Sequence, residues 1–99
     1  MAKRVLLVTA DLLFRSKLAA VVAAAGGEVT RDEAACDLAV LELAGPAAGR
    51  VGELVHRSIP VLAFGSHVWP DVLRAAREAG ATAVPNSEVA ARLRELLKT

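Results

Sequence analysis

Polar side chains follow apolar runs at four places in the sequence. The run Asp37–Leu43, reading DLAVLEL, carries a single acid near its end, Glu42. Apolar runs of this kind are typical of strands that are covered on both faces, as in a parallel sheet. Polar groups at the carboxyl ends of such strands can bind a ligand or a metal, or transfer a proton. We therefore predict a strand-end crevice lined by Thr9, Asp11, Glu42, Gly65, Ser66, His67 and Asn86.

Each of these residues also has a purely structural interpretation. Glu42 is either a catalytic or fixed charge at the ligand edge, or an acid that is solvated or paired with a nearby donor. Asp11 directly precedes an apolar helical pattern, which favours a helix N-cap over a metal ligand. Ser66 and His67 resemble a nucleophile beside a base, but no glycine-flanked elbow or orienting acid accompanies them. Ser66 is better explained as a cap of the next helix, and His67 as a pH sensor or a ligand contact. No catalytic set can be assembled, so we predict no enzyme.

Strand and helix patterns alternate along the chain and must position these residues. Helices are expected after Asp11 up to Gly26, from a first turn containing Pro46 to Ser58, from Val68 or Trp69 to Ala79, and after a cap at Asn86 or Ser87. Strands are expected at Val5–Thr9, Glu28–Arg31, Asp37–Leu43, Ile59–Phe64 and Ala81–Val84. This order predicts an α/β fold with a doubly wound, five-stranded parallel sheet in a flavodoxin-like, three-layer sandwich.

The link Asp32–Cys36 is too short for the usual crossover helix. Five extended residues span at most ~17 Å, and parallel neighbours normally need a dozen or more residues between them. The second helix is therefore predicted to be shortened or absent. One face of the sheet near the first and third strands would lose its cover, and exposed apolar surface usually finds a partner. We accordingly expect a homodimer, formed through the bare face or by exchange of the second strand.

Composition narrows the functional classes. Ninety-nine residues suit one domain, 1–99, and 55% hydrophobic residues with only 3% aromatics imply a core of small aliphatic side chains. The charge is +1, from 12 basic and 11 acidic residues, and the basic residues are dispersed, so no nucleic-acid partner is expected. Cys36 is the only cysteine, which favours a reducing, cytoplasmic setting, and it is expected to be a small apolar filler. The apolar run after the basic start is too short for a signal peptide or a membrane span.

Four segments together resemble a known family. They are VLLVTAD from Val5, DLAVLEL from Asp37, IPVLAFGS from Ile59 and AGATAV from Ala79. In order and spacing they resemble the first, third, fourth and fifth strands of bacterial response-regulator receiver domains. Receivers phosphorylate an aspartate at the tip of strand three, using a metal held by an acidic pair after strand one. A Ser/Thr and a Lys, ending strands four and five, read out the phosphate.

Carried over onto this sequence, the resemblance places other residues at each of these positions. Glu42 takes the place of the phospho-accepting aspartate. The remaining functional positions fall on Thr9 and Ala10 for the acidic pair, Gly65 for the Ser/Thr, Asn86 or Ser87 for the Lys, and Val84 for the aromatic switch. The resemblance therefore implies a degenerate receiver, or pseudo-receiver, with Glu42 as a vestigial phosphoacceptor and with no metal or cofactor.

The predicted function is a non-catalytic signalling or protein-interaction module. The resemblance points to the last two helices as the docking surface, and the residues singled out there are Trp69, Arg74, Arg77 and Arg92. Trp69 is either an interface anchor or a cover for the edge of the core. The arginines are a solvated helix face or a docking surface. The alternative function is small-molecule binding in the strand-end crevice.

Overall fold

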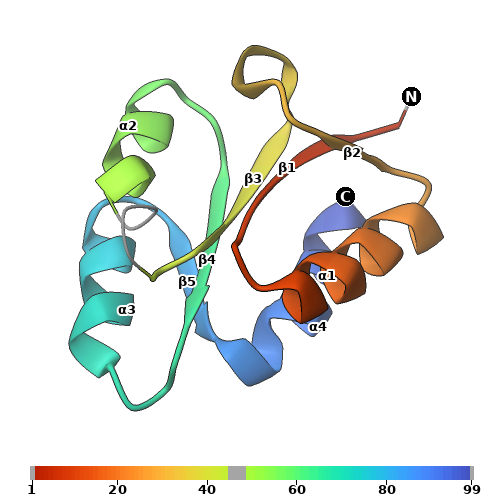
Figure 1. The fold of residues 1–99 in the computed structure, drawn as a ribbon. Helices are drawn as coiled ribbons and strands as arrows, with labels where there is room; N and C mark the ends of the chain where they lie inside the picture. Colours follow the sequence, from red (N-terminus) through yellow and green to blue (C-terminus); the bar gives the residue numbers. More distant parts are fainter. Residues whose placement is uncertain (1, 45–48, 99) are drawn as a thin grey trace.

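A computed structural model describes residues 2–44 and 49–98. Its five strands form one parallel sheet in the order β2-β1-β3-β4-β5 (Figure 1). The elements in chain order are β1 (Arg4–Val8), α1 (Leu12–Ala24), β2 (Glu28–Thr30), η1 (Glu33–Ala35), β3 (Leu38–Glu42), α2 (Arg50–His56), β4 (Val61–Gly65), α3 (Pro70–Glu78), β5 (Thr82–Pro85), η3 (Asn86–Glu88) and α4 (Val89–Leu97).

Helices cover both faces of this sheet, as a doubly wound fold requires. Helices α1 and α4 lie on one side, and α2 and α3 lie on the other (Figure 1). Successive strand residues alternate between the two cores: Val40 packs with the α1 and α4 side, whereas Ala39 and Leu41 pack with the α2 and α3 side. The predicted parallel, three-layer α/β fold is confirmed.

Local signals fix the ends of the helices. The Asp11 carboxylate accepts the amide protons of Leu13 at 2.9 Å and Phe14 at 3.2 Å, so the predicted N-cap of α1 is confirmed. Gly26, just after α1, has a φ of +80°. Gly80 follows α3 with a φ of +105°, which disfavours any residue with a side chain. Both glycines stand where the sequence predicts a helix stop.

The short link crosses from β2 to β3 because β2 is itself short. β2 pairs only with Arg4–Leu6, and β3 begins at Leu38 opposite Val5, so the chain needs to return by only about one residue along the strand direction. The sideways step over β1 is two strand spacings, roughly 10 Å. The 3-10 turn η1 fills this step, with Asp32 accepting the amide proton of Ala34 at 2.9 Å. The prediction of a missing second helix is confirmed.

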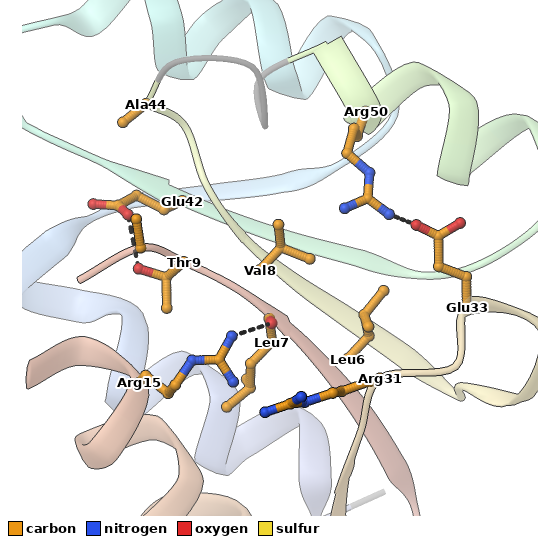
Figure 2. A pocket seen from close by; sticks show the side chains of 11 residues that line it. Leu6, Leu7, Val8, Thr9, Arg15, Arg31, Glu33, Glu42, Ala44 and Arg50 are labelled. Carbon is orange, nitrogen blue, oxygen red and sulfur yellow. Dashed lines mark hydrogen bonds and ion pairs between the residues drawn. The ribbon is translucent and has the colours of Figure 1, made fainter. Parts of the chain in front are cut away.

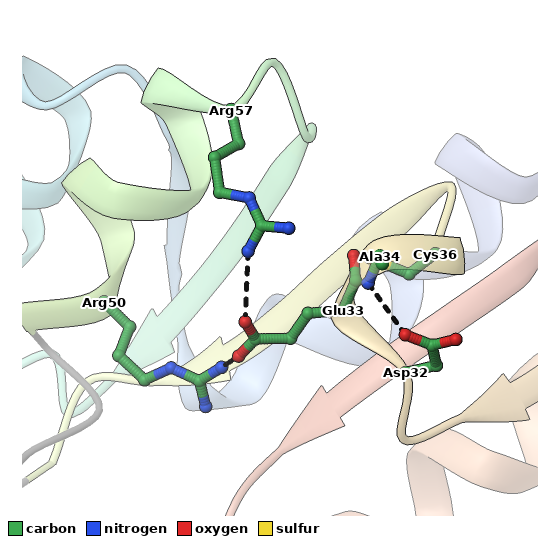
Figure 3. Close-up of polar contacts among 6 residues, drawn as sticks. All are labelled: Asp32, Glu33, Ala34, Cys36, Arg50 and Arg57. Carbon is green, nitrogen blue, oxygen red and sulfur yellow. Dashed lines mark hydrogen bonds and ion pairs between the residues drawn. The ribbon is translucent and has the colours of Figure 1, made fainter.

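The sheet face beneath this link is covered, which corrects the expectation of a bare face. Leu6 is only 5% exposed and Ala39 is fully buried. Cys36 packs against this core, as the filler interpretation predicts. Glu33 forms ion pairs with Arg50, in α2, and with Arg57, just after it (Figure 3). The link therefore replaces the helix as a cover.

The predicted caps near the end of the chain are wrong. Asn86 and Ser87 lie in η3, and α4 begins after Glu88 without a side-chain cap.

Ser66 accepts the amide proton of Val68 at 3.3 Å, in the turn before α3, whose N-cap residue is Trp69. The expected position of Pro46 in the first turn of a helix lies outside the described residues.

None of the helices in residues 2–44 and 49–98 has the length and apolar character that crossing a membrane requires.

Candidate functional site

Thr9 and Glu42 meet at the carboxyl ends of β1 and β3. The two strands are neighbours in register, with Val8 opposite Leu41, so the next residue of each chain lies at the same edge. The Thr9 hydroxyl donates to Glu42 Oε1 at 2.7 Å and accepts the Asp11 amide proton at 3.1 Å (Figure 2). The Glu42 carboxylate is thus paired with a nearby donor, which was one of its two sequence interpretations.

A cavity of about 480 Å³ opens beside this pair (Figure 2). Its floor is the apolar end of β1, and three arginines and two glutamates contribute to its walls. The residues that line it are Leu6, Leu7, Val8, Thr9, Ala10, Arg15, Arg31, Glu33, Glu42, Ala44 and Arg50.

The cavity contains only part of the predicted crevice. Thr9 and Glu42 line it, whereas the other five predicted residues do not: Asp11, Gly65, Ser66, His67 and Asn86. Gly65 lies next to Leu43 and Leu73, in a position where a side chain would meet the core of the other face. Asn86 keeps its side-chain oxygen buried with no hydrogen-bond partner in the described part of the chain, and His67 is exposed.

The side-chain oxygen atoms around Glu42 do not form the ligand set that a magnesium ion requires. Mg²⁺ requires a near-octahedral set of oxygens, usually including carboxylates that are free to coordinate. Asp11 holds the start of α1, and Glu42 accepts the Thr9 hydroxyl. No three His, Cys, Asp or Glu side chains converge on a common point within residues 2–44 and 49–98.

Sequence reasoning missed the charged walls of the cavity. Arg15 reaches back from α1 and donates to the Leu7 carbonyl at 3.2 Å, beyond the point where β2 stops pairing with β1. Arg31 directly follows β2, and Glu33 belongs to the link. Charged residues on both sides of an unusually short crossover were the available signal, because a missing helix leaves room that the flanking side chains must line.

The predicted interaction residues are distributed over α3 and α4. Trp69 is 63% exposed at the start of α3, next to Val68 at 64%. Arg74 pairs with Asp71 on the exposed side of α3. Arg77 donates twice to the Ala83 carbonyl of β5, at 2.8 and 3.1 Å.

A second cavity lies beside β5. Arg92, which pairs with Glu95 on α4, and Arg77 both line this groove of about 460 Å³, whereas Trp69 and Arg74 do not. The structure therefore brings together two of the four predicted residues.

Cys36 is shielded rather than activated. Burial raises the pKa of its thiol, and the negative charge of Asp37 also raises it, while a backbone hydrogen bond acts in the opposite direction. A thiol with a raised pKa is a poor nucleophile at neutral pH.

Comparison with solved structures identifies the architecture. NtrX from Brucella abortus matches with a TM-score of 0.74 at 19% identity, over 99% of this chain and 28% of that chain. The chemotaxis protein CheY4 of Vibrio cholerae matches with a TM-score of 0.75 at 18% identity, over 99% of this chain and 98% of that one. A response-regulator receiver domain protein from Clostridium thermocellum gives 0.79 at 13% identity, over 97% and 91%.

The chain has the fold of a receiver domain. This receiver-like chain spans little more than a quarter of the NtrX chain it matches. No protein-family model matches the sequence, and no curated protein does.

Proposed function

We propose that this receiver-like chain is a non-catalytic signalling or protein-interaction module that is not switched by aspartyl phosphorylation. The main support for the proposal is that Glu42 stands at the phosphoacceptor position and is already hydrogen-bonded. At the position that corresponds to the phosphoacceptor stands a longer carboxylate whose oxygen already accepts a hydroxyl proton from Thr9. Thr9 and Ala10 replace the acidic pair that would hold the metal. The resulting pseudo-receiver has a fixed negative charge where receivers acquire one transiently.

Phosphorylation chemistry gives a direct test. The protein is incubated with acetyl phosphate and magnesium, and its intact mass and amide NMR spectrum are recorded. The expected result is an unchanged mass and unchanged amide signals around Glu42. Acyl-phosphate formation at stoichiometric levels would overturn the proposal. Glu42→Asp in the same assay tests whether the longer side chain alone prevents phosphorylation. This variant is also expected to stay unphosphorylated, because the acidic pair that would hold the metal is absent.

The partner surface proposed for the module is the β5 edge of the sheet, which α3 and α4 flank from opposite faces. An exposed tryptophan beside an exposed valine is the kind of apolar anchor that interfaces use. Arg77 and Arg92 add positive charge to the groove beside β5. A second copy of the chain is the proposed partner, in a cytoplasmic setting, with neither nucleic acid nor membrane as a target.

Light scattering tests the dimer. At high micromolar concentration the wild-type chain is expected to be dimeric, and Trp69→Ala is expected to shift it toward monomer without loss of stability. Leu13→Ala is the matched control, because Leu13 is also an exposed apolar residue, at 83%, but it lies on α1. A strictly monomeric wild-type chain would count against the homodimer.

The alternative, small-molecule binding at the strand ends, is supported by the cavity beside Thr9 and Glu42. A thermal-shift screen tests it, since a ligand at a hundred times its dissociation constant adds about 2.7 kcal/mol to the free energy of unfolding.

A further inference from the structure

The cavity beside Thr9 and Glu42 has an excess of positive charge. Five charged side chains line the cavity over β1, three arginines and two glutamates. Glu33 is neutralised by Arg50 and also by Arg57, whereas the Thr9 hydroxyl binds Glu42 without cancelling its charge, so the three arginines and two glutamates of the lining leave an excess of one positive charge. The remaining two arginines, Arg15 and Arg31, carry the excess positive charge.

Arg15 and Arg31 both have N–H groups that are available to bind a ligand. A guanidinium has five N–H groups in a planar fork. Arg15 uses one of them on the Leu7 carbonyl, and neither arginine pairs with a carboxylate in the segments that the structure describes. Figure 2 shows both guanidinium groups on the same side of the cavity, away from the pair formed by Glu33 and Arg50. Two cations facing one cavity repel each other until an anion lies between them.

The volume and the apolar lining residues of the cavity indicate the size and chemical character of a ligand that would fit. The volume of about 480 Å³ falls in the range of small-ligand sites. Leu6, Leu7 and Val8 also line the cavity, and Val8 is the most exposed of the three, so a ligand with an apolar body would keep that body against Val8 at the end of β1 and its charged group at the arginines. Glu42, on another part of the wall, disfavours a second negative charge there.

We propose that this cavity binds a small organic oxyanion, with a carboxylate or phosphate group held by Arg15 and Arg31 and an apolar body resting on the end of β1. Guanidinium forks match the two oxygens of either group in a bidentate arrangement. The proposal gives the ligand-binding alternative a location and a ligand class, and it does not depend on the interaction role of α3 and α4.

Titration monitored by amide and arginine side-chain NMR signals tests the site. The probes are phenyl phosphate, benzoate and inorganic phosphate, added at constant ionic strength, and the two aromatic probes separate phosphate from carboxylate as the preferred head group. At least one aromatic probe is expected to give saturable shifts clustered at Leu7–Ala10, Arg15 and Arg31. Inorganic phosphate, which has no apolar body, is expected to bind at least about tenfold more weakly.

Two variants decide whether the arginines hold the anion. Arg31→Ala, at an exposed residue directly after β2, is expected to weaken binding of the preferred probe by about tenfold or more, whereas Arg74→Ala, an arginine of α3 outside the cavity, should change it less than about twofold. Shifts that rise linearly without saturation, or that spread over all basic residues, would overturn the proposal, as would unchanged binding by Arg31→Ala. These outcomes are distinct from acyl-phosphate formation, which bears only on the phosphorylation-independent role.

Discussion

The Thr9 hydroxyl donates to the Glu42 carboxylate at 2.7 Å and joins the carboxyl ends of β1 and β3. The same hydroxyl accepts the Asp11 amide proton, so it also holds the residue that caps α1. One side chain thereby couples the strand-end acid to the start of the first helix.

Thr9→Val is expected to destabilise the fold by about 1 kcal/mol, because a partly exposed hydrogen bond to a charged group is lost. Urea unfolding measures the change, and a double-mutant cycle with Glu42→Ala isolates the pair. Thr30→Val is the matched control, since Thr30 accepts the Asp32 amide proton at the same distance of 3.1 Å but has no carboxylate partner in the described residues. A coupling energy near zero would show that the contact contributes no stability.

Glu33→Gln is expected to loosen the link between β2 and β3. The two ion pairs of Glu33 are partly exposed, so screening limits the loss to about 0.5–1 kcal/mol, and about 1 M salt should reduce it further. Hydrogen exchange of the η1 amides should accelerate in parallel. Glu95→Gln, which removes a more exposed pair on α4, is the control and should change stability by less than about 0.5 kcal/mol. Equal effects from both substitutions would contradict a specific role for the link.

Gly80→Ala is expected to destabilise the chain by about 2–4 kcal/mol, through both backbone strain and overpacking. An added Cβ would lie 2.8 Å from a methyl group of Val55, at a φ of +105°. Gly26→Ala faces open space at a φ of +80°, so strain alone should cost about 1–2 kcal/mol. Thermal and urea unfolding of both variants separates the two contributions, and identical losses would show that the contact with Val55 relaxes freely.

Cys36 should be alkylated slowly at neutral pH, because burial raises the pKa of its thiol. The rate of reaction with iodoacetamide, followed against pH, is expected to rise at a higher pH in the folded protein than in urea. Since the folded state retains the proton longer, this group contributes stability below the pKa of the unfolded thiol, and that contribution is lost as pH rises through the folded value. Matching profiles in folded and unfolded protein would refute the shielding.

Apolar periodicity and glycine positions were sufficient to predict the sheet and its helices, and the length of the link Asp32–Cys36 predicted that the crossover has no helix. They work because each apolar run must be covered on two faces and each helix must end where a left-handed residue is available. The start of α4 was predicted wrongly because Asn86 and Ser87 lie in the 3-10 turn η3 and do not cap the helix.

The site was harder to predict than the fold. Thr9 and Glu42 could be placed at one edge, since parallel strands bring their carboxyl ends together. The walls of the cavity could not be predicted, because the positions of Arg31 and Glu33 depend on the path of the chain between β2 and β3. That path depends in turn on β2 ending after three paired residues.

Arg15 and Arg77, besides lining the two cavities, each bind a backbone carbonyl of a strand where no neighbouring strand in the described part of the chain covers it. Each places a guanidinium on a strand carbonyl, Leu7 beyond the end of β2 and Ala83 in β5. Positive side chains on exposed strand edges discourage the addition of a further strand from another molecule. The β5 border and the stretch of β1 that extends past the end of β2 are thereby protected from edge-to-edge aggregation.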